Sequence, residues 1–183
     1  MGPDAPRVIS PRIDPQVPVF ALGRYAGARR QAIVAMKDRG RADLSAPLAQ
    51  ALALGVHRLL NWGLLDVPLT IVPAPTRRSA ARRRGGDPVT RVTTLATAGH
   101  PHISVVRALR MKALARDSAG LGSAARERNI AGRVLLTGRP PPASAEVLLV
   151  DDIVTTGATA CESVRILQTA GARVSAVLAL AAA

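Results

Sequence analysis

The chain of 183 residues is long enough for one domain with a sizeable core. Apolar residues make up 48% of it and aromatic residues only 2%, so the core must consist of Ala, Val and Leu. The one cysteine, Cys161, excludes an internal disulfide and a Cys-rich zinc site, and suits a small packed side chain in a reducing cytoplasm. No apolar run approaches the ~20 residues of a membrane helix, and prolines interrupt the first twenty residues, so neither a membrane span nor a secretory signal is predicted.

The net charge of +13 comes almost entirely from arginine, and much of it lies between Arg77 and Arg139. A basic field of this kind attracts either nucleic acid or a small polyanion. The low aromatic content leaves little for base stacking, which weakens the case for a dedicated single-strand binder.

The first half of the chain predicts two helices between two strands. In chain order we expect an irregular segment (1–16), a short strand (17–22), two helices (25–37 and 44–60) and a buried strand (67–72). Pro18 favours an edge position for the first strand, because proline cannot donate to a sheet. His57 is expected to be an ordinary histidine on a helix face.

The second half alternates helices and strands. We expect a helix (87–98), a strand (103–106), a mobile loop (107–123), a short helix (124–129), a strand (134–136), a proline-rich linker (138–142), a buried strand from 147, a helix from near 159 and a last strand (173–180). Asp87 is the expected N-cap of its helix and Pro88 its first residue. His100 and His102 suggest a metal pair, but no third ligand lies nearby, which favours an ordinary role. Alternating strands and helices predict an α/β fold with an open parallel sheet flanked by helices.

The most informative stretch runs from Val147 to Thr159. An apolar strand buried on both faces is followed by Asp151 and Asp152, and then by the sequence Thr-Thr-Gly-Ala-Thr at a helix start. Small residues at a helix N-terminus predict an anion site, since free N–H groups and the helix dipole point at the ligand. Two acids beside a phosphate make sense if the ligand also brings hydroxyl groups or a divalent metal, as a ribose phosphate does.

A helix cap, a nucleotide-binding loop and a phospho-acceptor site each fit this stretch less well. A single N-cap explains one polar residue, not two acids and three threonines around a glycine. Neither a Walker phosphate loop nor a Gly-x-Gly-x-x-Gly dinucleotide motif is present. A phospho-acceptor domain would place its acids earlier in the chain.

A second motif follows the strand at 67–72. Pro73-Ala74-Pro75-Thr76-Arg77-Arg78 predicts a proline-fixed turn, and an arginine fork there suits a diphosphate. In an open parallel sheet, ligands gather beyond the carboxyl ends of the strands. Both motifs follow strands, so we expect them to face one pocket.

The stretch from Val147 to Thr159 resembles the ribose-phosphate signature of the type I phosphoribosyltransferases. Over residues 25–183 the order of features resembles the ComF (GntX-like) family within that superfamily. The residues that carry this second resemblance are Tyr25-Ala-Gly27, Lys37, Val72–Pro75, the arginine block up to Arg84-Gly85, and Arg126-x-x-Asn129.

The resemblance implies a role for each motif. Asp151 and Asp152 would hydrogen-bond the ribose hydroxyls of phosphoribosyl pyrophosphate (PRPP) and help to place Mg²⁺. The terminal phosphate would be wrapped by Thr155, Thr156, Gly157, Ala158 and Thr159. The pyrophosphate would be bound by Ala74, Pro75, Thr76, Arg77 and Arg78. Arg110 or Arg116 would close over the site. One domain is implied, with a small hood at 1–45 and a core at 66–183.

The chain departs from the family pattern in three places. The Cys-rich zinc ribbon with which members usually begin is absent, Gly85-Gly86-Asp87-Pro88 replaces Gly-Phe-Asn-Gln, and a loop glutamine is replaced near Asp117-Ser118. The leading hypothesis is a Mg²⁺-dependent phosphoribosyltransferase that displaces pyrophosphate from PRPP onto an unknown acceptor. The alternatives are a non-catalytic, competence-related protein that binds single-stranded DNA, and a PRPP-sensing regulator.

Overall fold

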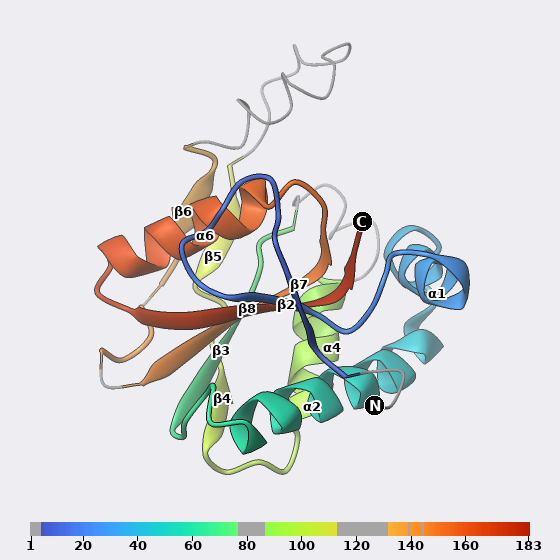
Figure 1. The fold of residues 1–183 in the computed structure, drawn as a ribbon, viewed down its shortest axis with the longest axis horizontal. Helices are drawn as coiled ribbons and strands as arrows, with labels where there is room; N and C mark the ends of the chain where they lie inside the picture. Colours follow the sequence, from blue (N-terminus) through green and yellow to red (C-terminus); the bar gives the residue numbers. More distant parts are fainter. Residues whose placement is uncertain (1–4, 77–86, 113–131, 139, 144) are drawn as a thin grey trace.

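The computed structural model describes residues 5–76, 87–112, 132–138, 140–143 and 145–183. Its centre is a six-stranded sheet in the order β1 (Arg7–Ile9), β2 (Val19–Ala21), β8 (Arg173–Ala182), β7 (Glu146–Val154), β3 (Leu69–Pro73) and β4 (Ile103–Val105), shown in Figure 1. All neighbours are parallel except β1 and β2. A small antiparallel sheet pairs β5 (Leu109–Met111) with β6 (Val134–Leu136). The predicted α/β fold with an open, mostly parallel sheet is confirmed.

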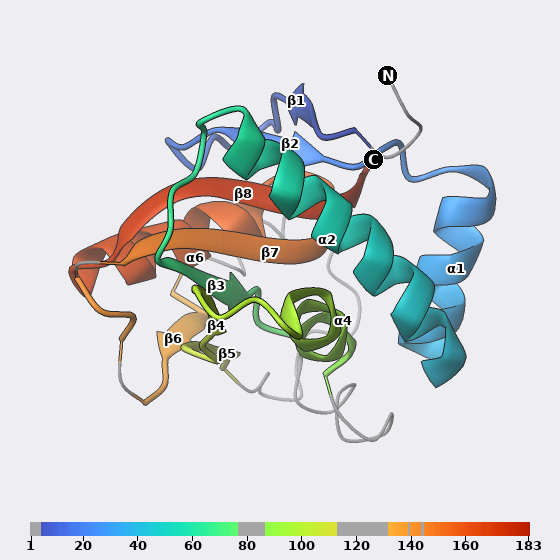
Figure 2. The same cartoon turned by 90° about the horizontal axis from the view of Figure 1, so that it is seen from below.

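Helices cover both faces of the large sheet (Figures 1 and 2). One face carries α6 (Ala158–Thr169), and the other carries α1 (Gly27–Asp38), α2 (Ser45–Asn61) and α4 (Pro88–Thr97), with the short helix η1 (Ala42–Leu44) before α2. None of the helices in the described part of the chain is long and apolar enough to cross a membrane.

Strand β7 supplies both layers of the core. Leu148 and Val150 pack with the residues of α1, α2 and α4, whereas Val147 and Leu149 pack with those of α6. All four side chains are buried, as expected for a strand covered on both faces. This strand matters for function, because Asp151 and Asp152 follow these four residues within it.

The start of α4 agrees with the prediction. The Asp87 carboxylate accepts a hydrogen bond from the Val89 N–H at 3.2 Å, and Pro88 is the first helical residue. The Thr90 hydroxyl donates to the other oxygen of Asp87 at 2.6 Å. The N-terminus of this helix is therefore fixed by side chains rather than by solvent.

Three expectations about strands were wrong. β2 is not an edge strand, because β1 forms within residues expected to be irregular and pairs outside it. Pro18 precedes β2 and only accepts a bond, from Val177, so its missing N–H costs the sheet nothing. Residues 109–111, expected to belong to a mobile loop, form β5 by pairing with β6. β7 does not end before its acids, since β8 pairs with it as far as Val154.

Candidate functional site

Strands β3 and β7 lie side by side at a point where the chain connections diverge. β3 leads through α4 to β4 on one side, and β7 leads through α6 on the other face to β8 on the opposite side. In open α/β sheets ligands bind at such a topological switch point, beyond the carboxyl ends of the strands. Pro73 at the end of β3 pairs with Val150, directly before the acids of β7. The two predicted motifs therefore leave the sheet from neighbouring positions.

The loop after β7 encloses a small hollow of about 50 Å³. It is lined by Asp151, Ile153, Val154, Thr155, Thr156, Gly157, Ala158, Thr159 and Ala160. Gly157 caps α6 with φ +86°, in the left-handed region that favours glycine. The first hydrogen bond of the helix runs from the Cys161 N–H to the Gly157 carbonyl, so the N–H groups before Cys161 have no carbonyl one turn back. The Ala158 N–H donates to the Thr156 hydroxyl at 3.4 Å, and the N–H groups of Thr159 and Ala160 can bind an anion.

The N-terminal segment around Pro11 and Ile13 packs against this loop and fixes it. The Ile13 N–H donates to the Thr156 carbonyl at 2.8 Å, and Pro11 and the Ile13 carbonyl lie against Gly157. The bond occupies a carbonyl oxygen that would otherwise be free near an anion. A Cβ at position 157 would collide with Ile13 and Pro11, so glycine is required for space as well as for its backbone angle.

The two acids of β7 lie in different surroundings. Asp152 is buried with 5% of its surface exposed, and its Oδ2 lies 2.7 Å from Nζ of Lys37 in α1. Asp151 is half-buried and lines the hollow, and its Oδ1 accepts the Asp152 N–H at 2.8 Å. The sequence resemblance included Lys37 without a role for it. The structure places it against the acid pair.

The charged groups of this cluster shift one another's pKa values. Burial, then repulsion from Asp152, raises the pKa of Asp151 to about 8, although Lys37 opposes the shift. Burial on its own would lower the pKa of Lys37, but the charge and hydrogen bond of Asp152 outweigh it and the pKa rises. Lys37 is therefore an ammonium throughout the neutral range, and it partly neutralises the pair.

The acid pair is a poor fit for a resident Mg²⁺ held by both carboxylates. The Lys37 ammonium already contacts Asp152, and a dication beside it would be repelled. Within the described residues, no three His, Cys, Asp or Glu side chains gather as a metal site, and His100 and His102 have no third partner there. Asp151 alone remains as an acidic side chain at the hollow.

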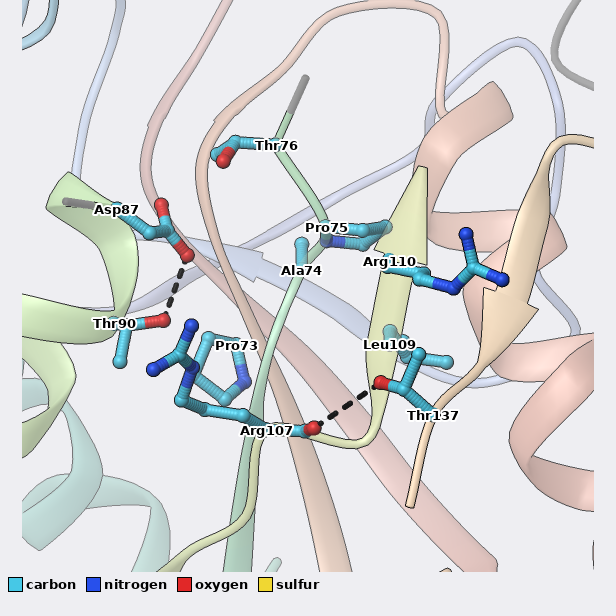
Figure 3. Close-up of a pocket in the computed structure, with 10 residues that line it drawn as sticks. All are labelled: Pro73, Ala74, Pro75, Thr76, Asp87, Thr90, Arg107, Leu109, Arg110 and Thr137. Atoms are coloured by element: carbon cyan, nitrogen blue, oxygen red, sulfur yellow. Dashed lines mark hydrogen bonds between the residues drawn. The ribbon is translucent and has the colours of Figure 1, made fainter. Parts of the chain in front are cut away.

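The loop after β3 borders a second, larger hollow of about 230 Å³ (Figure 3). Its lining consists of Pro73, Ala74, Pro75, Thr76, Asp87, Thr90, Arg107, Leu109, Arg110 and Thr137. In Figure 3 the Arg107 side chain extends toward Thr90 and Asp87, and Arg110 extends away from them across Pro75. The Arg107 carbonyl accepts a hydrogen bond from the Thr137 hydroxyl at 3.4 Å, which joins β6 to this wall.

Part of the predicted pyrophosphate loop lies outside the described residues, namely Arg77 and Arg78. Arg116, Arg126 and Asn129 also lie there. The Ala74 N–H donates to the Val150 carbonyl at 2.7 Å, and Pro75 has no N–H, so Thr76 is the first described residue of this loop with an amide to offer a ligand. Among the described residues, Arg107 and Arg110 line this hollow.

The structure brings together most of the described site residues that the sequence predicted. Asp151 and the five residues from Thr155 to Thr159 line the small hollow, and Ala74, Pro75, Thr76 and Arg110 line the large one. Asp152 lies behind the small hollow, among the residues that pack toward α1. Cys161 lies in α6 as expected, only partly buried, and burial with the nearby Glu162 and Asp14 carboxylates raises the pKa of its thiol.

Sequence reasoning missed Thr90, and it named Arg107 only among the arginines of the DNA-binding alternative. The spacing of Asp87 and Thr90 at the start of α4 was a usable signal, since a residue three positions after an N-cap reaches back toward it. No protein-family model matches the chain, and no curated protein matches it. The resemblance to the ComF family therefore stays a prediction, as do the roles that it implies.

Proposed function

We propose that the chain binds a 5-phosphorylated ribose in the small hollow and transfers it as a type I phosphoribosyltransferase of the ComF kind. The observation that carries the proposal is the hollow itself. N–H groups of the first turn of α6 and the hydroxyls of Thr155, Thr156 and Thr159 surround a space of about 50 Å³, with the Asp151 carboxyl group at its rim. That combination suits a phosphate joined to a polyol, because the amides bind the anion and the carboxyl group binds hydroxyls.

The donor would be PRPP, and the larger hollow supports this choice. It begins beside the small one at adjacent strand ends and holds two arginines, which suit a diphosphate. In the transfer, the bond between the anomeric carbon and the diphosphate oxygen breaks, and the diphosphate keeps the electron pair. An acceptor nucleophile then bonds to the anomeric carbon. Arg107, Arg110 and the Thr76 amide stabilise the charge that grows on the leaving group.

The remaining roles are positional. The Ile13 bond and Gly157 fix the phosphate loop, so the sugar is held at one end while the diphosphate departs at the other. Mg²⁺ belongs to this proposal as a companion of the substrate phosphates, in line with its preference for few protein ligands and its poor fit between the acids. The acceptor stays unassigned.

Titration calorimetry with ribose 5-phosphate, and with PRPP in the presence of Mg²⁺, tests the binding. Thr156→Val with Thr159→Val removes two hydroxyls without changing side-chain volume much, and we expect about tenfold weaker binding of both ligands. The matched control is Thr169→Val at the far end of the same helix. Wild-type protein that binds neither ligand would refute the proposal.

Turnover separates the enzyme from a PRPP-sensing regulator, since only the enzyme releases pyrophosphate when amine and base acceptors are screened. The hypothesis of single-stranded DNA binding depends on two groups of arginines. The block from Arg77 to Arg84 lies outside the described residues, and the group from Arg107 to Arg116 is described as far as residue 112. A steep fall of oligonucleotide affinity with salt would favour that alternative, and a shallow slope would oppose it.

A further inference from the structure

We infer that the two acids of β7 have different jobs: Asp151 contacts the sugar, and Asp152 is a positioning residue that Lys37 of the hood helix α1 holds in place. The inference rests on the proposed function and departs from the equal roles that the family resemblance implies. It also gives the hood a direct link to the sugar site.

The surroundings of Asp152 leave it no route to a ligand in the hollow. Its residue is 5% exposed, it is absent from the lining of the hollow, and Oδ2 contacts Lys37 Nζ at 2.7 Å. Leu148 and Val150 precede it at two-residue spacing and pack on the side of α1 and α2. Asp152 follows in the same strand, and its carboxyl group meets Lys37 of α1.

Asp151 borders the hollow and has spare bonding capacity, although its carboxyl group also interacts with that of Asp152. It lines the hollow together with the phosphate loop, and one of its oxygens accepts the Asp152 N–H at 2.8 Å. A carboxyl group has about four lone-pair positions, so this bond leaves room for sugar hydroxyls. It also ties the orientation of Asp151 to the backbone of Asp152.

Lys37 connects this pair to α1. The helix packs on the sheet through the buried Ile33 and Met36, and Arg29 donates to the Leu180 carbonyl at 3.3 Å. The contact between Lys37 and Asp152 is a shorter polar link and the one that reaches the site. Movement of Asp152 would shift the N–H that orients Asp151, so losing Lys37 should weaken sugar binding without touching the phosphate loop.

The test compares two probes, ribose 5-phosphate and inorganic phosphate, by titration calorimetry on the full chain. Inorganic phosphate reports whether the loop is intact, and the difference between the probes reports the sugar contact. We expect Asp151→Asn to weaken the binding of ribose 5-phosphate about tenfold and to change the affinity for inorganic phosphate much less. Lys37→Met should weaken ribose 5-phosphate in the same selective way, and Lys37→Arg should restore much of the loss.

The double variant Lys37→Met with Asp152→Asn decides between positioning and contact. It removes both charges together, so no buried charge is left unpaired, and it keeps the test usable if Lys37→Met alone folds poorly. We expect it to weaken ribose 5-phosphate less than Lys37→Met alone and less than Asp151→Asn. If the double variant loses as much sugar affinity as Asp151→Asn, Asp152 contacts the ligand and the inference is wrong. If wild type binds neither probe, the proposed function fails with it.

Discussion

The loop after β7 and the loop after β3 leave adjacent strands but are fixed in different ways. The first is held by the Ile13 bond, a glycine with no room for a side chain, and an acid anchored through Lys37. The second has one backbone bond, from Ala74 to Val150, and then opens onto a cationic hollow several times larger. The difference indicates that the loop after β7 is shaped for one invariant ligand group, and that the hollow at the loop after β3 admits a larger and more highly charged group.

Removing Lys37 should destabilise the region around the loop after β7 more than the other substitutions do. Lys37→Met leaves the Asp152 carboxylate buried and unpaired, and we expect a loss of about 3 kcal/mol in the free energy of unfolding, measured in urea. This value is at the low end for a buried pair, because 28% of the lysine side chain is exposed.

The pair of Arg41 and Asp43 provides the matched control. It has the same N–O distance of 2.7 Å, but its side chains are 60% and 58% exposed. Arg41→Met should leave the unfolding midpoint unchanged, because solvent screens such a pair. Equal losses in the two variants would show that the pair of Lys37 and Asp152 is no better shielded than a surface pair.

Gly157→Ala should disturb the phosphate loop itself. The new Cβ must adopt φ +86° and collides with Ile13 and Pro11, so we expect a loss of about 1–3 kcal/mol and of phosphate binding. Gly171→Ala has nearly the same backbone angle, φ +85°, with open space around it. It should lose less stability and keep phosphate binding. Similar results for both variants would show that the contact of Gly157 with Ile13 and Pro11 contributes little.

The arginines test the larger hollow. Arg107→Ala or Arg110→Ala should weaken PRPP about tenfold, because a charged hydrogen bond to the diphosphate is lost. Ribose 5-phosphate has no diphosphate, so its affinity should change little. Arg173→Ala, at the opposite end of the sheet, removes the same charge and controls for the general field. A comparable loss of ribose 5-phosphate affinity would place the arginines at the sugar phosphate instead.

The sequence predicted the elements that local pattern determines. The apolar run before Asp151, the small residues at the start of α6 and the cap at Asp87 each carry their signal within a few residues, and all three are found. A parallel sheet also predicted that both motifs would lie beyond the carboxyl ends of strands. That their strands, β3 and β7, are neighbours is a finding of the structure.

What the sequence left open depends on contacts between distant segments. Lys37 and Asp152 are far apart in the chain, and only the packing of α1 brings them together. β1 and β5 are three residues long and exist because β2 and β6 pair with them. The division between Asp151 and Asp152 also escaped local pattern, because it depends on β7 continuing through both acids and on α1 placing Lys37 against only one of them.

The pH dependence of stability has a definite sign. The pKa of Asp151 is raised to about 8 in the folded chain, mainly by burial, and an unfolded aspartate titrates near ~3.9. Between these values the folded state binds more protons than the unfolded state, so stability falls as pH rises from about 5 to about 8 and then levels off. Asp151→Asn should remove this slope in urea unfolding followed across that range.

Glu162→Gln is the control for the same measurement. Arg165 and the Gly132 N–H hold the pKa of Glu162 below its ordinary value, so its contribution is lost only in acid, as pH falls below about 4. That variant should therefore differ from wild type by a constant amount above about pH 5. If the slope survives in Asp151→Asn, another group titrates there, and the carboxyl group at the rim of the hollow is ionised like an ordinary surface aspartate.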